Sequence, residues 1–277
     1  MSLRESRTYK IMRYVVLAVT SAFVFIPVVP VVFLALKTGA EMRETSFLTP
    51  PRNFFNTYNF LWAMEIGELI PAFGNTMFIV IAALFISCSL ACMVAYVLQR
   101  FTFIGKKIVF NMFVLTMFIP VVTTQVVVFR IIHSMGLVNN RLSVILLYSG
   151  VSIVDIYIVS NLLNSMSTEL DEAGLIDGAG AFRIFFSIIL PLLKPAIVTM
   201  SVIKGIGFYN DFYIPNLYLI NNHQTITVAL HRFFTIGLSA PFEVLSAAVL
   251  LATIPVIIMF LFLQRFIYDG LSGAVKG

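Results

Sequence analysis

Charged residues are scarce in this chain, and their scarcity argues against a soluble globular domain. Only 11% of the 277 residues are charged and 60% are hydrophobic, whereas a soluble domain carries about 25% charged residues. Cysteine is rarer still. Cys88 and Cys92 lie four residues apart in an apolar run, so they are expected to share one helix face as packing residues. With no histidine near them, neither a disulfide framework nor a metal site is supported.

Basic residues are few and dispersed, although the net charge is +5. They form no clustered surface, so nucleic acid is not expected as a partner. Residues 1–13 hold four of them before the first apolar run, and residues 99–107 hold three after the second. Positive charge near a span end favours the cytoplasmic side. Both segments are therefore predicted to be cytoplasmic.

Long apolar runs account for most of the chain and predict six transmembrane helices. Runs of about 20 apolar residues are long enough to cross a bilayer as helix. The runs cover residues 14–36, 75–98, 108–132, 143–163, 196–219 and 244–263. We therefore predict an all-α polytopic membrane protein with both termini in the cytoplasm. Its predicted parts are a cytoplasmic N-terminus at 1–13, one transmembrane domain at 14–277, a cytoplasmic loop at 164–195 and a cytoplasmic tail at 264–277.

Prolines inside two of these runs predict bent helices. Pro27 and Pro30 lie in the first run and Pro120 in the third, and proline removes a backbone donor from the helix. Thr123, Thr124 and Gln125 follow Pro120 directly. Their side chains would either bond the freed carbonyls or face an aqueous path.

Residues 37–74 form the longest polar segment and are predicted to lie outside the membrane. Several aromatic residues occur between positions 54 and 62. Such rings suit the membrane interface. Two interpretations stay open for this segment: an interfacial cap, or part of a docking surface for a binding protein.

Charged residues within the apolar runs mark candidate sites. Asp155 lies in the fourth run, where a carboxylate is expected to face a cavity or a partner helix. Lys204 in the fifth run is a candidate partner for it.

The second half of the fifth run is interrupted by polar residues, which predicts a broken helix lining a cavity. The candidate substrate-path residues there, together with one from the third run, are Tyr209, Asn210, Asp211, Tyr213, Asn216 and Gln125. Aromatic rings beside amide and carboxylate groups suit a sugar. The alternative is that this span simply ends at the external surface, with its polar residues in water.

One polar stretch, residues 169–195, separates the fourth and fifth runs. Thr168 followed by Asp171 predicts a capped helix start. Glu172-Ala173-Gly174, three residues, Gly178, nine residues and Ile188-x-Leu190-Pro191 then follow. This spacing resembles the EAA motif of ABC-importer permeases. Further likenesses, such as Tyr209-Asn210-Asp211-Phe212 and the glycine-rich tail, extend it over nearly the full length, to the smaller permease of the maltose-transporter type.

The resemblance implies a type I ABC-importer permease of the bacterial or archaeal cytoplasmic membrane. It implies a second permease as heterodimer partner, a dimer of ATP-binding subunits, an extracytoplasmic solute-binding protein and a sugar substrate. It also implies that the EAA stretch forms a coupling helix in a groove of the ATPase, with Glu169, Glu172, Ala173, Gly174, Asp177 and Gly178 as coupling residues. Glycine at position 174, where the family usually has alanine, is expected to alter the docking slightly.

The tail of this permease type resembles one that reaches into the ATPase dimer, which implies contacts by Gly273, Val275 and Lys276. A frayed terminus is the alternative. The chain has no GxxxxGK[ST] phosphate loop, so ATP and Mg²⁺ are expected on the partner ATPase, with no cofactor in this chain.

Three other functions stay open at this point. A permease for a polyol or a glycerol phosphate compound would share the same architecture. A secondary transporter would show inverted repeats and intramembrane ion sites, for which Asp155 and Lys204 alone are thin support. A membrane-embedded enzyme would need a nucleophile with a base, or a metal motif, and the sequence offers neither.

Overall fold

The computed structural model describes residues 7–220, 223–235 and 241–274, and every regular element among them is a helix. The chain forms two compact units: residues 1–70 with 229–254, and residues 71–228 with 255–277. Unit 1 contains α1 Arg7–Phe25, α2 Val28–Leu36, α3 Gly39–Glu44 and α4 Tyr58–Ile66. Three helices cross a unit boundary: α5 Leu69–Arg100, α15 Ile226–Thr235 and α16 Phe242–Ala274.

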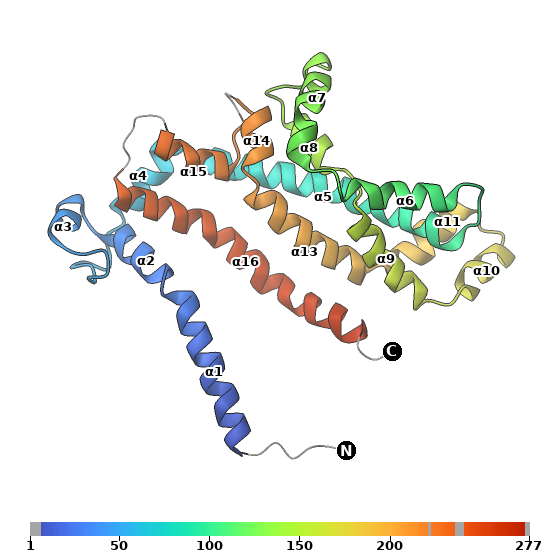
Figure 1. The fold of residues 1–277 in the computed structure, drawn as a ribbon, viewed down its shortest axis with the longest axis horizontal. Helices are drawn as coiled ribbons and strands as arrows, with labels where there is room; N and C mark the ends of the chain where they lie inside the picture. The colour runs from blue at the N-terminus through green and yellow to red at the C-terminus, as the bar shows by residue number, and fades with distance from the viewer. Residues whose placement is uncertain (1–6, 221–222, 236–240, 275–277) are drawn as a thin grey trace. The chain divides into compact units, whose positions relative to one another are not determined.

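Unit 2 holds the remaining helices and both candidate sites (Figure 1). They are α6 Lys106–Thr116, α7 Val121–Ser134, α8 Arg141–Tyr148, α9 Ile153–Asn164, α10 Glu169–Ile176, α11 Ala181–Ile184, η1 Phe185–Ile189, α12 Leu190–Leu192, α13 Lys194–Asn210 and α14 Tyr213–Tyr218. η1 is a single π-helical turn.

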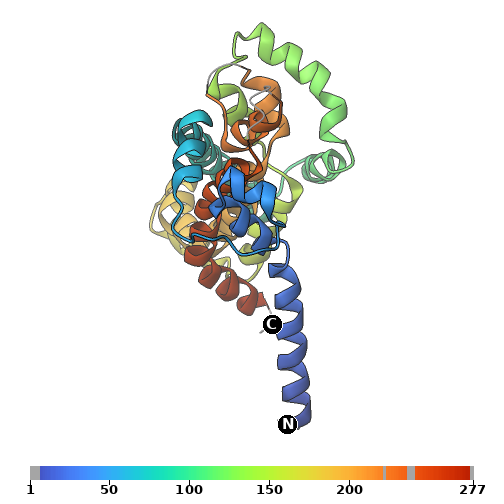
Figure 2. The same ribbon diagram turned by 90° about the vertical axis from the view of Figure 1, so that its left-hand side faces the viewer.

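Two of the described helices are long and apolar enough to cross a membrane alone, Leu69–Arg100 and Phe242–Phe262. Four bent helix pairs raise the number of candidate spans to six, as the sequence predicts. The bends are 42° between α1 and α2, 104° between α6 and α7, and 51° between α8 and α9. The fourth bend, 70°, lies between the segment Ala181–Leu192, which runs from α11 to α12, and α13. Figure 2 shows the sharp elbow at which α7 turns away from α6.

Prolines explain two of these bends, as predicted. Pro27 occupies the break between α1 and α2, and Pro120 is the N-cap of α7. After Pro120, the hydroxyls of Thr123 and Thr124 donate to the carbonyls of Pro120 and Val121 at 2.7 and 2.9 Å. These hydroxyls bond to backbone carbonyls of their own helix, which is the structural alternative considered for them.

Several boundaries differ from the prediction. The fourth span is broken at residues 149–152, so Asp155 lies in the first turn of α9 rather than deep inside a helix. The polar segment 37–74 contains α3 and α4 and buried polar groups: Lys37 donates to Thr45 and to the Ser46 carbonyl at 3.0 and 2.6 Å. Local hydrogen bonds therefore fold this segment without an apolar run.

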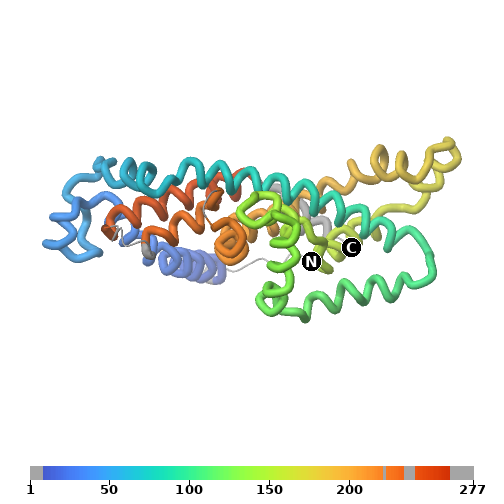
Figure 3. The backbone as a smooth tube through the Cα atoms, turned by 90° about the horizontal axis from the view of Figure 1, so that it is seen from above, coloured from blue at the N-terminus to red at the C-terminus, as the bar shows by residue number. Residues whose placement is uncertain are grey.

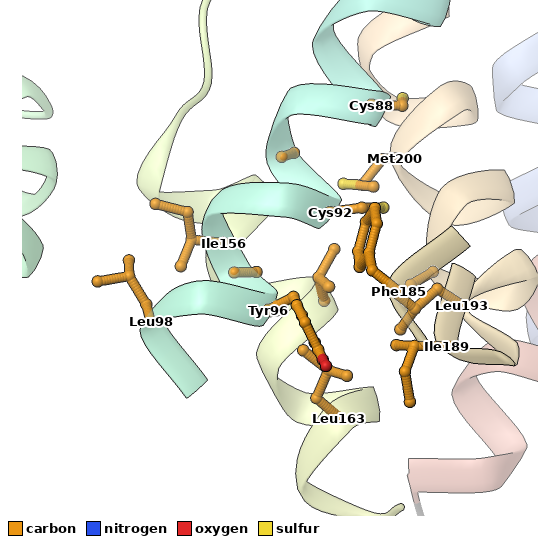
Figure 4. Packing of buried hydrophobic residues seen from close by; sticks show 14 of the residues in the cluster. Cys88, Cys92, Tyr96, Leu98, Ile156, Leu163, Phe185, Ile189, Leu193 and Met200 are labelled. Atoms are coloured by element: carbon orange, nitrogen blue, oxygen red, sulfur yellow. The ribbon is translucent and has the colours of Figure 1, made fainter. Parts of the chain in front are cut away.

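The larger core cluster of unit 2 joins α5, α9, η1 and α13 (Figure 4). Cys88 and Cys92 are both buried in it as free thiols, in the packing role predicted for them. Tyr96 of the same helix packs on Phe185, with ring centroids 5.1 Å apart. This core fixes the last turns of α5 against the elements that flank α10.

Candidate functional site

The exposed face of α10 carries most of the predicted coupling residues. Glu169, Glu172, Ala173 and Asp177 are exposed. Leu175 and Ile176 are also open, at 62% and 86% exposure. In Figure 3, α10 and α11 (yellow) meet at one end of unit 2. The short helix therefore offers carboxylates, a small residue and two apolar side chains on one accessible segment.

Gly174 is the buried residue of α10 and faces its own chain. A Cβ at this position would lie 2.9 Å from Cγ1 of Ile184 and 3.2 Å from Cδ1 of Ile188. The absence of a side chain therefore lets α10 pack closely against α11 and η1. The departure from alanine acts inside this chain, on the packing beneath the exposed face.

Gly178 ends α10 in the left-handed conformation, with φ +77°. Its N–H donates to the Leu175 carbonyl at 3.0 Å, and the N–H of Ala179 donates to the Gly174 carbonyl at 2.9 Å. These two bonds form a Schellman motif, which requires a residue tolerant of positive φ. The turn that the sequence predicts at Gly178 is present.

The start of α10 differs from the prediction. Thr168 has helical angles, φ −68° and ψ −19°, and its side chain makes no capping bond. A capping residue needs an extended backbone, which Thr168 does not have. Ser167 accepts the Glu169 N–H at 3.2 Å instead. The capping role assigned to Thr168 and Asp171 is therefore wrong.

Asp171 instead anchors α10 to the end of α5. The Tyr96 hydroxyl donates to Asp171 Oδ1 at 2.5 Å, and Arg100 Nε lies 3.3 Å from Oδ2. The side chains of Arg100 and Asp171 are 11% and 17% exposed. The Arg100 contact is an ion pair rather than an aligned hydrogen bond. A charged pair sheltered from water thus joins the second span to the first turn of α10.

Arg100 also holds the end of α9. Its Nη2 donates to the carbonyls of Leu163, Met166 and Ser167 at 3.4, 3.0 and 3.5 Å. A cation at a helix C-terminus is favourable because the last carbonyls carry partial negative charge. Gln99 donates to Asn164 beside it. One residue therefore binds both the end of α9 and the start of α10.

The predicted break in the fifth span is present between α13 and α14. Asp211 has an extended backbone, and its Oδ1 accepts the N–H groups of Tyr213 and Ile214 at 2.8 and 3.4 Å. Its Oδ2 accepts the Tyr148 hydroxyl at 2.8 Å, and its carbonyl accepts from Thr227 at 2.8 Å. Asp211, one residue before the N-cap Phe212, therefore accepts the first two N–H groups of α14 and joins this helix to α8.

The other substrate-path candidates differ in exposure. Asn210, Tyr213 and Asn216 are exposed around the break, whereas Tyr209 is buried at 4%. Gln125 is buried on α7, where its Oε1 accepts the Tyr218 hydroxyl at 2.8 Å. The structure thus brings Gln125 to the end of α14.

Asp155 and Lys204 form the ion pair suggested by the sequence. Lys204 Nζ lies 2.9 Å from Asp155 Oδ2 and 3.1 Å from the Gly150 carbonyl. Asp155 also forms a capping box with Ser152, whose side chain accepts the Asp155 N–H at 3.2 Å. The pair bridges α9 and α13, so helix bridging is the role the structure gives to Asp155.

The tail residues are only partly described. Gly273 lies in the last helix, α16, whereas Val275 and Lys276 lie outside the described residues. Across the part of the chain that the structure describes, no group of three metal-ligating side chains occurs.

Residues 87–273 match the family of binding-protein-dependent transport system inner membrane components. The chain belongs to this family. The permease is 33% identical over 282 residues to a melibiose/raffinose/stachyose import permease of Bacillus subtilis, covering 99% of this chain and 100% of the relative. It is 30% identical to a galactooligosaccharides transport permease of the same organism, with 95% and 94% coverage. A diacetylchitobiose uptake permease of Streptomyces coelicolor shares 27% identity, with 97% and 89% coverage.

The fold is that of an ABC-importer permease. A chain of a bacterial ABC transporter that imports the polysaccharide alginate superposes with a TM-score of 0.82 at 19% identity, covering 96% of this chain and 98% of that one. The permease is accordingly a non-catalytic, multi-pass inner-membrane subunit of a binding-protein-dependent ABC importer, whose ATPase is a separate subunit.

Residues outside the predicted site carry much of its geometry. Tyr96, Arg100, Tyr148 and Tyr218 were given no individual role from the sequence, because their partners lie 63 to 93 residues away in the chain. Ser152 had a local signal, since Ser152-x-x-Asp155 has capping-box spacing. The prolines and glycines were the stronger guides because their effects are local.

Proposed function

We propose that the permease imports oligosaccharides, in a complex with a second permease, a dimer of ATP-binding subunits and an extracytoplasmic solute-binding protein. The relatives named above transport melibiose, raffinose, galacto-oligosaccharides and diacetylchitobiose, which supports a short oligosaccharide as substrate. ATP and Mg²⁺ bind the partner ATPase. Residues 14–277 form the transmembrane part, with the N-terminus, the 164–195 loop and the tail from 264 in the cytoplasm. Gly273, Val275 and Lys276 make a second ATPase contact.

The coupling role is supported by the two faces of α10: one face packs against the rest of the permease, and the other is exposed to solvent. Asp171 and Gly174 are bound within the permease, whereas Glu172, Ala173 and Ile176 are exposed. A short helix fixed to its own chain and wedged into a partner's groove moves with that partner. We assign the ATPase contact to the exposed face, with Glu169, Asp177 and the Gly178 turn completing the segment.

The substrate path is assigned to the break between α13 and α14. Asn210, Tyr213 and Asn216 are exposed there and offer two amides and a ring to sugar hydroxyls and faces. We assign an indirect role to Asp211, Tyr209 and Gln125, which position the residues that line the path. The Asp211 carboxylate and the Gln125 carbonyl oxygen already accept hydrogen bonds from within the permease, so they are less available to a sugar. A polyol substrate remains the second candidate, because a relative from Synechocystis takes up osmoprotective compounds.

Pull-down of the ATPase subunit and uptake by the reconstituted complex test the coupling role. Glu172→Ala should weaken ATPase retention by removing an exposed carboxylate. Gly178→Asp should do so by placing a side chain at φ +77°. Glu65→Ala, at an exposed helical glutamate of α4, is the matched control for retention. Full retention and uptake in both coupling variants would refute the assignment. Uptake of labelled raffinose, galacto-oligosaccharide and a sugar alcohol, competed against each other, distinguishes the substrate classes.

A further inference from the structure

The last two turns of α5 contain a polar cluster that the transport function does not by itself explain. α5 has 32 residues, which at 1.5 Å per residue is a rod of about 48 Å. The hydrocarbon core of a bilayer is about 30 Å thick. A helix of this length is longer than the hydrocarbon core is thick, and Tyr96 and Arg100 lie in its C-terminal turns.

The polar contacts of Tyr96 and Arg100 lead to the α9–α10 segment. Tyr96 and Arg100 bind the two carboxylate oxygens of Asp171, at 2.5 and 3.3 Å. Arg100 binds three carbonyls that end α9 or link it to α10. Five contacts thus converge from one helix on the end of α9, the link to α10 and the first turn of α10.

The aromatic surroundings hold this cluster in place. The Tyr96 ring packs at 5.1 Å from Phe185 and edge-on at 5.7 Å from Phe101. Figure 4 shows Tyr96 reaching from α5 toward Leu163 of α9. The buried ring fixes the hydroxyl in position, so Asp171 meets a pre-oriented donor. α10 itself is short, eight residues, and a helix of that length is marginal without tertiary contacts.

We propose that Tyr96, Arg100 and Asp171 are positioning residues that rigidly join the coupling helix to the second span, so that a displacement of α10 by the ATPase is transmitted into α5. This inference rests on the proposed coupling role of α10 and adds the path by which its motion enters the membrane. Asp171 faces its own chain and takes no part in the ATPase contact. Its loss should uncouple ATP hydrolysis from transport rather than abolish assembly.

The test compares uptake per ATP hydrolysed in the purified, reconstituted complex, normalised to retained ATPase subunit. Asp171→Asn removes the charge from the ion pair. Tyr96→Phe removes only the hydroxyl and keeps the ring contacts with Phe101 and Phe185. Both should lower the transport-to-ATP ratio several-fold with ATPase subunit retained, and Asp171→Glu should recover part of the loss. Hydrogen exchange of the α10 amides should accelerate in the same variants.

The matched control is Glu44→Gln, which also removes a carboxylate paired with arginine, but at an exposed site 3.0 Å from Arg52. It should leave the ratio and α10 exchange unchanged. An unchanged ratio and unchanged exchange in Asp171→Asn and Tyr96→Phe would overturn the proposal. A parallel loss of ATPase activity and uptake with loss of folded chain would also overturn it, because that marks a purely structural role. If Glu172→Ala and Gly178→Asp both retain the ATPase and full uptake, the coupling role of α10 itself fails, which separates the two failures.

Discussion

The ion pair between Asp155 and Lys204 should be strongly coupled energetically, and a double-mutant cycle can measure this. The two side chains are 4% and 13% exposed and 2.9 Å apart. Lys204→Met leaves a buried carboxylate that still accepts a hydrogen bond from the Ser152 N–H but has lost its counter-charge. Asp155→Asn leaves a buried ammonium with the Gly150 carbonyl and no counter-charge. Removing one partner of a buried pair costs about 3–5 kcal/mol.

The double variant Asp155→Asn/Lys204→Met should cost much less than the sum of the two single variants. No charge is then buried, and an asparagine at 155 still accepts the Ser152 N–H as a cap. We expect a coupling energy of at least about 2 kcal/mol between the two positions. The measurement is loss of helicity by circular dichroism during denaturant titration of the purified complex.

An exposed ion pair on the same chain provides the control cycle. Arg52 and Glu44 are 68% and 59% exposed and 3.0 Å apart. The cycle Glu44→Gln/Arg52→Met should be additive to within about 1 kcal/mol, as surface pairs usually are. If the Asp155–Lys204 cycle is additive to within about 0.5 kcal/mol, the contact contributes no coupling and the bridge between α9 and α13 is refuted.

Three further predictions follow from single contacts. Gly174→Ala should lower the free energy of unfolding by about 1 kcal/mol. Overpacking against Ile184 costs about 1–3 kcal/mol, which outweighs the gain in helix propensity of about 1 kcal/mol. A variant that is more stable in thermal unfolding would contradict the packing. Tyr218→Phe should cost about 1–3 kcal/mol, since buried Gln125 loses its donor, and an unchanged melting curve would contradict the bond. Asp211→Ala should lose about 1 kcal/mol of capping while Asp211→Asn keeps it; equal stability of both, with uptake lost in both, would mark a substrate contact instead.

Features set by local chemistry could be predicted from the sequence. Pro27 and Pro120 mark the breaks in the first and third spans, and Gly178 marks the turn after α10. Asp155 and Lys204 are candidate partners from the sequence, because an isolated charge in an apolar run is costly, but their pairing depends on the packing of α9 against α13. Proline, glycine and an isolated charge in an apolar run each permit only a few local structures, so each can be interpreted from the sequence.

Features set by distant partners could not be predicted. The spacing of Thr168 and Asp171 predicts a cap, but the partner of Asp171 is Tyr96, which lies 75 residues earlier in the chain. The break at 149–152 does have local signals, Ser149-Gly150 and the Ser152-x-x-Asp155 spacing, but the apolar residues on both sides predict one continuous span. The exposure of Glu172 and burial of Gly174 depend on how α11 and η1 fold back on α10.

The two polar clusters of unit 2 are connected through α9. Asp155 lies in the first turn of this 12-residue helix, and Arg100 binds the carbonyl of Leu163 in its last turn. A largely buried charged residue therefore binds each end of α9. Lys204 of α13 pairs with Asp155 at its start, and Arg100 of α5 binds the Leu163 carbonyl at its end. Because both ends of this short helix are bound, we expect a shift at the Arg100 end to reach Lys204. The same geometry explains why uptake as well as stability should be followed in Lys204→Met, since that variant releases the far end of the connection while leaving α10 untouched.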